Sequence, residues 1–183
     1  MKTYAFVDGG YLRAWGGKFN VPYPNPWTAC WSSLLIAQGV PQAGSAHELH
    51  RLTYYDALPD ELGTPESKGV EAYMRSIEVL QNCQLGYGTL RKRRGRGNEQ
   101  KGVDTLVAVD MLVGAFTGLF EAALLLSGDA DFVPVVHEVK RRGVHVIVGA
   151  HEASLSDELR RSADRVRYLG PDCLRALAVA ETS

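Results

Sequence analysis

The sequence predicts an α/β domain with a mostly parallel central sheet and helices on both faces of that sheet. Three observations favour this class: short β-rich segments alternate with segments of helical length, most β-rich segments are apolar throughout, and several of them end at an aspartate or a glycine. Continuous apolar strands separated by helices are typical of parallel sheets that are covered on both faces. The 183 residues suit one domain, and we expect residues 1–183 to form it.

The first half of the chain is expected to begin with a buried strand over residues 3–8 and a tight turn through Gly9 and Gly10. Residues 15–30 contain three prolines and are expected to be mostly loop. Thr64 and Pro65 suit the N-cap and first position of a helix. The other predicted elements of this half are a helix over 28–40, a strand over 51–57, a helix over 64–83 and a strand over 84–91.

In the second half of the chain, predicted helices and strands alternate more regularly. It is expected to begin with a polar, glycine-containing loop over residues 91–101. The elements predicted after that loop are a helix over 102–118, a strand over 122–128, a helix over 131–143, a strand over 144–150, a helix over 155–164, a short strand over 165–170 and a terminal helix over 171–180.

Composition excludes several classes of protein. The formal net charge is −1, so the chain as a whole gives no electrostatic indication of a nucleic-acid partner. Cys30, Cys83 and Cys173 show no CxxC spacing, which argues against a zinc site or a disulfide framework. No apolar run approaches the ~20 residues of a membrane helix, and the N-terminus does not read as a signal peptide. We therefore expect a cytoplasmic protein that does not enter a membrane.

Aspartates stand where predicted strands end. Asp8 follows the first strand, Asp56 the second, and Asp129 and Asp131 the fourth, while Asp104 opens the helix before the fourth strand. The carboxyl ends of parallel strands share one edge of a sheet, which is where α/β proteins bind ligands. Clustered carboxylates raise the pKa of one another, and Mg²⁺ or Mn²⁺ relieves that cost by binding to their oxygens.

Helix capping is the alternative role for each of these carboxylates. Asp131 directly precedes FVPVV and is the more expected cap, whereas Gly128 would let Asp129 approach a ligand closely. Asp104 and Asp110 are six positions apart on one predicted helix and so lie on faces about 120° apart. We assign Asp104 to the site and Asp110 to a structural hydrogen bond.

Four blocks of sequence together resemble a known family: FVDGGYL (6–12), KGVDTLVAVDML (101–112), LLLSGDADFVPVV (124–136) and RRGVHVIVGA (141–150). In this order they are similar to the NYN domain, in the LabA-like (DUF88) branch of the PIN-like nuclease superfamily. The resemblance implies a PIN-like three-layer fold with strand order 3-2-1-4-5, an acidic pocket at the strand ends and metal-dependent ribonuclease activity. By position, it implies four catalytic and metal-binding acids, Asp8, Asp104, Asp129 and Asp131, and places the family's motif lysine at Lys101.

One position departs from the family pattern. Tyr11 stands where the family usually has an asparagine, which would help to fix the first aspartate or a metal-bound water. A tyrosine hydroxyl could replace that hydrogen bond, or the bond could be missing. We expect Tyr11, Asp56 and Ser127 to lie behind the metal ligands rather than among them.

The stretch 91–101 has a local net charge of +5 and leads directly into Asp104. A phosphate backbone that passes an acidic metal site needs cations beside it, so we assign RNA binding to Arg91, Lys92, Arg93, Arg94, Arg96 and Lys101. A solvated loop is the alternative. Aromatic residues between Tyr11 and Trp31 could stack on bases; a satellite core under a long loop or a dimer contact is the alternative.

These observations predict a metal-dependent endoribonuclease that hydrolyses the phosphodiester bonds of single-stranded RNA with Mg²⁺ or Mn²⁺. A non-catalytic RNA-binding or regulatory module and a DNA-cleaving nuclease are the alternatives. A homodimer is a further expectation. No P-loop pattern is present, and Ser127 lacks a GxSxG setting, which argues against a nucleoside triphosphatase and a serine hydrolase.

Overall fold

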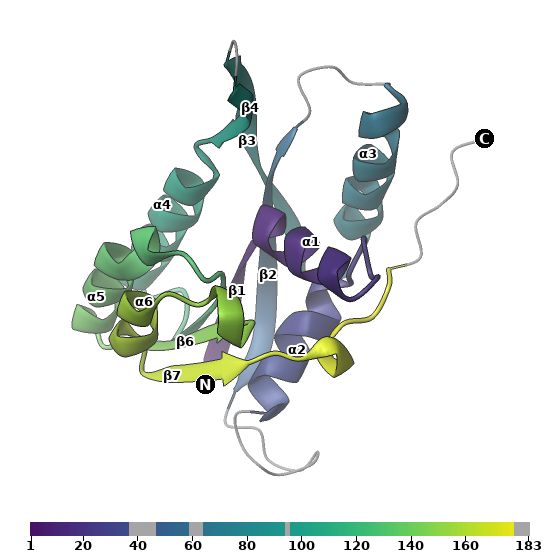
Figure 1. The fold of residues 1–183 in the computed structure, drawn as a ribbon. Helices are drawn as coiled ribbons and strands as arrows, with labels where there is room; N and C mark the ends of the chain where they lie inside the picture. The colour runs from purple at the N-terminus through teal and green to yellow at the C-terminus, as the bar shows by residue number, and fades with distance from the viewer. Residues whose placement is uncertain (37–46, 59–63, 94–95, 178–183) are drawn as a thin grey trace.

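The protein, described here from a computed structural model, is built on one central sheet (Figure 1), and the structure describes residues 1–36, 47–58, 64–93 and 96–177. The strand order is β4-β3-β2-β1-β5-β6-β7. The strands are β1 (Lys2–Asp8), β2 (Glu48–Leu58), β3 (Cys83–Arg93), β4 (Arg96–Lys101), β5 (Ala122–Leu126), β6 (His145–Ala150) and β7 (Arg165–Tyr168). The neighbours from β3 to β7 pair in parallel, and β4 pairs antiparallel with β3. The predicted parallel sheet and its strand order are confirmed.

Helices cover both faces of the sheet. One face carries α1 (Gly9–Lys18), α2 (Pro26–Ile36) and α3 (Pro65–Glu78), and the other carries α4 (Val103–Phe116), α5 (Val133–Arg141) and α6 (Asp157–Ser162). Three short 3-10 turns complete the described elements: η1 (Ala130–Phe132), η2 (Glu152–Ser154) and η3 (Pro171–Cys173). The three-layer α/β fold expected from the sequence is therefore confirmed.

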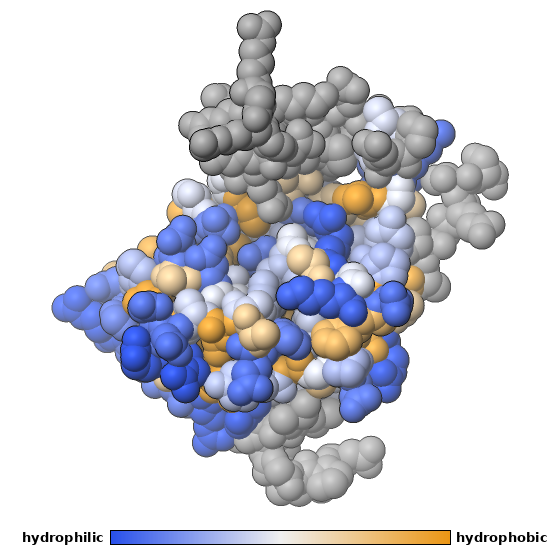
Figure 2. Space-filling view, in the orientation of Figure 1, coloured by the Kyte–Doolittle hydropathy of each residue, from blue (hydrophilic) through white to orange (hydrophobic). Residues whose placement is uncertain are grey.

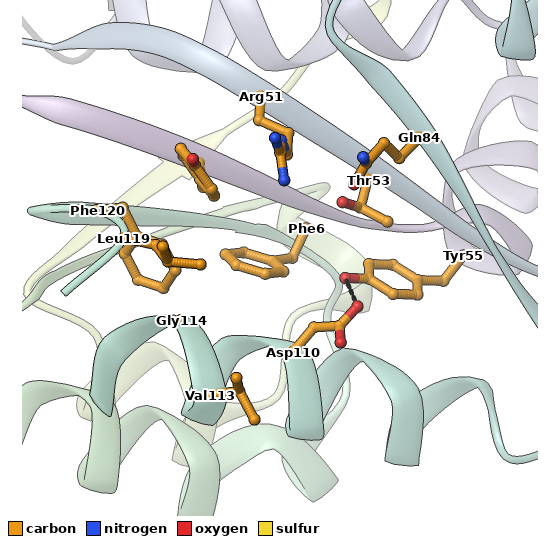
Figure 3. A pocket seen from close by; sticks show the side chains of 11 residues that line it. Phe6, Arg51, Thr53, Tyr55, Gln84, Asp110, Val113, Gly114, Leu119 and Phe120 are labelled. Carbon is orange, nitrogen blue, oxygen red and sulfur yellow. Dashed lines mark hydrogen bonds between the residues drawn. The ribbon is translucent and has the colours of Figure 1, made fainter. Parts of the chain in front are cut away.

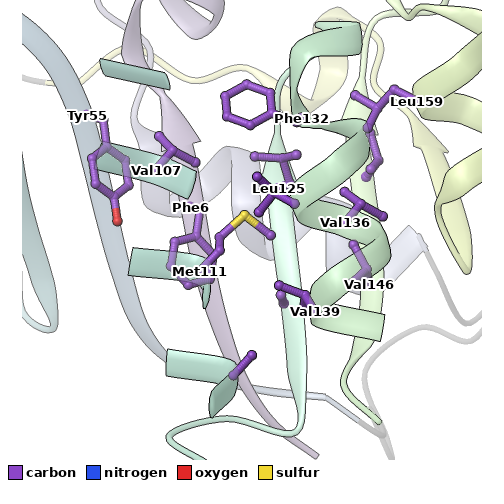
Figure 4. Packing of buried hydrophobic residues seen from close by; sticks show 14 of the residues in the cluster. Phe6, Tyr55, Val107, Met111, Leu125, Phe132, Val136, Val139, Val146 and Leu159 are labelled. Carbon is purple, nitrogen blue, oxygen red and sulfur yellow. The ribbon is translucent and has the colours of Figure 1, made fainter. Parts of the chain in front are cut away.

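Alternation along the strands divides the core into two clusters, one on each face. On β1, Ala5 and Val7 face the cluster under α1 and α2, whereas Phe6 faces the cluster under α4 and α5. Figure 4 shows Phe6 beside Met111 of α4, with Leu125 of β5 packed toward α5. Every residue of β5 is buried, as a strand covered on both faces requires.

The first helix was not expected from the sequence. Residues 15–30 were predicted to be mostly loop and residues 9–10 a tight turn, but α1 begins at Gly9 and continues to Lys18. Asp8 caps this helix, since its Oδ1 accepts a hydrogen bond from the backbone N of Tyr11 at 3.0 Å. A side chain at Gly9 would collide with the ring of Tyr54, so that glycine serves close packing on β2 rather than a turn.

The predicted loop over residues 91–101 is also wrong, because β3 and β4 pair there as antiparallel strands. The register places Arg91 opposite Glu99 and Leu90 opposite Gln100. Polar and charged residues suit β4 because it is the edge of the sheet, where side chains need no apolar partner. Residues 94–95 lie outside the described residues.

The predicted terminal helix over 171–180 is wrong for the residues that the structure describes. After η3 the chain is extended, and a bridge joins Ala176 to Pro24. Cys173 and Leu174 are buried in the cluster under α1 and α2. The apolar residues of this segment are therefore buried without forming a helix. The predicted helix over 28–40 is present as α2 up to Ile36, and residues 37–40 and 178–180 lie outside the described part of the chain.

Within the described ranges, no helix is long and apolar enough to cross a bilayer. Figure 2 shows hydrophilic residues gathered over α5 and α6. Apolar exposure is concentrated instead on α4 and the turn after it, at Val109, Val113, Phe116 and Leu119.

Candidate active site

Three predicted carboxylates lie together at the carboxyl edge of the sheet. Asp8, Asp104 and Asp129 line a pocket of about 390 Å³. They come from the end of β1, the first turn of α4 and the segment after β5. The remaining lining residues are Gly10, Tyr11, Ser127, Gly128 and Ser154. The edge that the sequence indicated therefore carries an acidic pocket.

Asp8 is the best-anchored of the three carboxylates. Its Oδ1 accepts from the backbone N of Tyr11, and its Oδ2 accepts from the hydroxyl of Ser127 at 3.2 Å. The second contact arises because β1 and β5 are neighbours, with Val7 beside Leu126. Burial, and after it the negative charge of Asp104, raises the pKa of Asp8 to about 6 against the lowering effect of the two hydrogen bonds.

The pKa of Asp104 is raised as well. Its pKa is raised by burial first and then by Asp129 and Asp131. Among the described residues, none of Asp8, Asp104 and Asp129 forms an ion pair. The pocket thus holds negatively charged carboxylates that repel one another, and a bound cation would relieve this repulsion.

Asp129, and not Asp131, is the capping residue after β5, and it also lines the pocket. Asp129 is the cap, since its Oδ1 accepts from the backbone N of Asp131 at 3.0 Å at the start of η1. Asp131 lies inside η1, and α5 begins after Phe132 without a side-chain cap, so the expectation that Asp131 caps this helix is wrong. Asp131 does not line the pocket, although its charge reaches Asp104. Its assignment as a ligand stays a prediction.

The donor set of the pocket suits a hard divalent cation by its chemistry. All three acids offer carboxylate oxygens, the ligands that Mg²⁺ and Mn²⁺ prefer. Within the described ranges, however, no three His, Cys, Asp or Glu side chains are grouped closely enough to hold a metal ion as they stand. Asp8 is held by its hydrogen bonds, whereas Asp104 and Asp129 are exposed, so those two side chains are the ones that would have to turn toward an ion.

Tyr11 does not replace the family asparagine through its hydroxyl. That hydroxyl lies 2.8 Å from Oγ of Ser154 and accepts from the backbone N of His151 at 2.7 Å. The hydrogen bonds to Asp8 come instead from the backbone of Tyr11 and from Ser127. The side chain of Tyr11 therefore ties the end of β1 to the segment after β6.

Replacing Tyr11 with phenylalanine is expected to lower the free energy of unfolding by about 1–2 kcal/mol, because the half-buried backbone N of His151 loses its acceptor. The hydrogen bonds to Asp8 remain in this variant, so any RNA cleavage should stay within about tenfold of wild type. Chemical denaturation and an initial-rate assay measure the two effects. A loss of cleavage as large as that of an aspartate variant would contradict a purely structural hydroxyl.

Sequence reasoning missed Ser154 and His151. Both follow β6, the neighbour of β5, so they reach the same edge of the sheet as Asp129. Gly128 packs so closely on the backbone of Ser154 that a Cβ there would collide with its carbonyl oxygen. Their position directly after a predicted strand was the one feature of the sequence that could have indicated them, because neither residue belongs to a recognised motif.

Asp56 lies behind the pocket as a partner of Arg13. Its two oxygens accept from Nε and Nη2 of Arg13 at 2.8 and 2.9 Å, and Oδ2 also accepts from the hydroxyl of Tyr54 at 3.0 Å. The carboxylate is fully buried and does not line the pocket, but its charge contributes to the raised pKa of Asp8. Asp110 accepts from the hydroxyl of Tyr55 at 2.8 Å, which confirms the structural hydrogen bond predicted for it.

The predicted RNA-binding cations are placed by backbone alone. Arg91, Lys92 and Arg93 belong to β3, and Arg96 and Lys101 belong to β4. Their side chains and the whole of Arg94 lie outside the described residues. The backbone of β4 nevertheless ends beside the pocket, because Gly102, at φ +86°, turns the chain directly into the first turn of α4.

The aromatic residues after β1 mostly pack into the main core cluster under α1 and α2, rather than into a separate satellite core. Trp15 is 2% exposed, and Phe19, Tyr23 and Trp27 pack against the same cluster. Trp31 differs, with 41% of its surface exposed.

Asp8→Asn is expected to stabilise the metal-free protein above pH 6. A folded-state pKa of about 6 exceeds the ordinary 3.8, so the folded wild type binds more protons than the unfolded chain between these values, and its stability falls as pH rises through that window. Solvent screening of the partly exposed group limits the gain to about 1–2 kcal/mol. Thermal denaturation in chelator at pH 4 and pH 8 measures it. Equal differences between variant and wild type at the two pH values would contradict the raised pKa.

A parallel sheet in this strand order, with carboxylates gathered at its carboxyl edge, defines the PIN-like nuclease fold. The chain belongs to the NYN domain family, one of the PIN-like nuclease families, whose model matches residues 20–170. The matched range contains Asp104, Asp129 and Asp131 and begins after Asp8.

The fold is also similar to a solved structure. This is the crystal structure of a protein of unknown function, VPA0982, from Vibrio parahaemolyticus RIMD 2210633, with a TM-score of 0.65 and 18% identity. The alignment covers 95% of this chain and 96% of that one, so the two share the fold over nearly their whole lengths. No curated protein sequence matches the chain.

Proposed function

We propose that the protein is a metal-dependent endoribonuclease that hydrolyses phosphodiester bonds in single-stranded RNA. The observation that carries the proposal is the pocket in which Asp8, Asp104 and Asp129, distant in sequence, lie at one edge of a sheet in a chain of a nuclease family. Carboxylates of the same sign are not brought together for stability, since each raises the pKa of its neighbour.

Asp8, Asp104 and Asp129 would hold Mg²⁺ or Mn²⁺, with Asp131 as a further candidate ligand. Such an ion, when bound, supplies positive charge to the phosphoryl oxygens and lowers the pKa of water. The protein's own contribution is orientation. Ser127 and the backbone of Tyr11 fix the direction of the Asp8 carboxylate, and the short turn η1 fixes the backbone between Asp129 and Asp131.

Binding of the RNA backbone is proposed for the basic hairpin of β3 and β4. Strand β4 ends at Lys101, and the chain continues through Gly102 into the first turn of α4, which carries Asp104. The end of the basic hairpin is therefore next to the acidic pocket in the chain. Phosphate contacts of this kind give affinity without base specificity and weaken as salt concentration rises.

A non-catalytic RNA-binding or regulatory module is the second candidate, favoured by the contacts of Tyr11. Its side chain makes no hydrogen bond to Asp8, unlike the role implied for the family asparagine. A DNA-cleaving nuclease would use the same carboxylates.

The test is incubation of a labelled single-stranded RNA of mixed sequence with the protein and Mn²⁺, with excess chelator as control and single-stranded DNA of the same sequence in parallel. We expect Mn²⁺-dependent internal cuts in RNA that leave 5′-phosphate and 3′-hydroxyl ends. RNA binding without cleavage at any Mn²⁺ concentration would favour the non-catalytic module, and equal cleavage of DNA would contradict the choice of RNA.

A cytoplasmic location and a homodimer complete the proposal. The three cysteines are free thiols in the structure, as expected for a reducing compartment. Light scattering of the purified protein measures the oligomeric state directly.

A further inference from the structure

A second pocket lies between α4 and the strands β1, β2 and β3, and it shares no residue with the acidic pocket. Its volume is about 160 Å³ (Figure 3). The floor is apolar, with Phe6 and Phe120 almost fully buried around Gly114. The rim is polar, and it is formed by the exposed residues Arg51, Gln84 and Asp110 and the half-buried Thr53. An apolar floor with a few polar groups at the rim is typical of small-ligand sites.

Two opposite charges face this pocket from different elements. Arg51 extends from β2 and Asp110 from α4, and among the residues that the structure describes neither forms an ion pair with the other or with a third group. Their charges are therefore available to a ligand that offers hydrogen-bond acceptors on one side and donors on another.

Aromatic neighbours position both charged groups. The guanidinium of Arg51 lies over the ring of Tyr4, 5.4 Å from its centroid. The hydroxyl of Tyr55 donates to Oδ2 of Asp110 at 2.8 Å, which Figure 3 shows as a dashed line across the right of the pocket. A carboxylate oxygen retains acceptor capacity after one such bond. The site is thus preorganised, with Phe6 between the two groups in the same view.

We propose that this pocket binds a guanine base. Guanine carries acceptors at O6 and N7, which match the fork of a guanidinium, and donors at N1 and the 2-amino group, which match a carboxylate. The aromatic side chains Tyr4 and Phe6 provide apolar contact for a flat ring. Adenine lacks both O6 and a proton at N1, so it would leave Asp110 and Arg51 incompletely matched, and pyrimidines fill less of the cavity.

The base has two possible sources, a free guanine nucleotide or a guanosine within RNA. Asp110 lies six residues beyond Asp104 on α4, a distance of about 9 Å along the helix axis. A strand that passes the acidic pocket is therefore near enough to present a nucleotide. The RNA source rests on the proposed function, whereas binding of a free nucleotide does not.

The first experiment titrates metal-free protein, in chelator, with GMP, AMP, CMP and UMP by calorimetry. We expect GMP to bind at least about tenfold more tightly than the others, since a bidentate pair discriminates by 1–3 kcal/mol. Asp110→Asn and Arg51→Lys should each weaken GMP binding by about tenfold or more. Asp172→Asn is the control and should leave GMP binding unchanged, because Asp172 is exposed and lines neither pocket.

Folding of the variants is checked independently. Asparagine at position 110 still offers an oxygen to the hydroxyl of Tyr55, and Arg51 is exposed, so unfolding midpoints should stay close to wild type. Equal binding of all four nucleotides, no binding of GMP, or unchanged GMP affinity in both variants would overturn the proposal.

The second experiment distinguishes the sources by mapping cleavage of RNAs that carry a single guanosine at varied positions. Cuts at a fixed distance from the guanosine, lost in Asp110→Asn, would assign the base to RNA. Cuts independent of guanosine, with GMP binding intact, would assign it to a free nucleotide. Absence of all cleavage would count against the proposed nuclease and leave the nucleotide titration as the test of the pocket.

Discussion

Replacing Asp129 with asparagine is expected to reduce cleavage of single-stranded RNA by more than about 100-fold, because even residues that only orient metal ligands contribute about 10–100-fold. The fold should persist. Asparagine is as good a cap as aspartate, and its oxygen can still accept from the backbone N of Asp131. The variant removes one negative charge from the pocket while leaving the geometry of η1 in place.

An initial-rate assay in Mn²⁺ measures this effect, and binding of the same RNA in chelator shows whether affinity survives. Asp172→Asn is a suitable control, because Asp172 is exposed in η3 and does not line the acidic pocket. Turnover by Asp129→Asn equal to that of wild type would contradict the assignment of this carboxylate.

Replacing Arg13 with methionine is expected to lower the free energy of unfolding by about 3 kcal/mol, near the lower end of the cost of breaking a buried ion pair. Asp56 is fully buried and receives two hydrogen bonds from the guanidinium, so the variant leaves an uncompensated charge inside the protein. The side chain of Arg13 is 29% exposed, which keeps the expected cost below the upper limit. Methionine retains the apolar stem that packs along the surface.

Denaturant unfolding measures this loss, and a double variant provides the control. Arg13→Met combined with Asp56→Asn removes the buried charge together with its partner and should recover part of the stability. A cost below about 1 kcal/mol for Arg13→Met would show that the pair behaves as an exposed salt bridge.

The regular part of the fold follows from the sequence because burial on both faces leaves a direct signature. β5 is apolar at every position and fully buried, and the helices of the second half lie between strands as predicted. The strand order came from the family resemblance. The meeting of Asp8, Asp104 and Asp129 was predictable because the carboxyl ends of parallel strands share an edge.

The remaining features depend on contacts that composition does not report. Gly9 looks like a turn residue, yet its missing side chain lets α1 approach Tyr54. The polar β4 looks like a loop, yet an edge strand needs no apolar face. The 3-10 turn η1 lies between β5 and α5 and makes Asp129 the capping residue in place of Asp131. No periodicity in the sequence indicates this turn.

The second pocket also went unnoticed in the sequence, because its residues belong to four separate elements and to the turn after α4. Asp110 was correctly expected to make a structural hydrogen bond, but Arg51 drew no attention. Only the pairing of β1, β2 and β3 beneath α4 brings these charges to one cavity.

Titration of the protein with Mn²⁺, followed by the paramagnetic resonance signal of the free ion, tests the central claim most directly. We expect saturable binding by wild type that Asp8→Asn, Asp104→Asn and Asp129→Asn each weaken by about tenfold or more, and that Asp172→Asn leaves unchanged. No saturable binding by wild type, or binding that the three pocket variants leave intact, would contradict it.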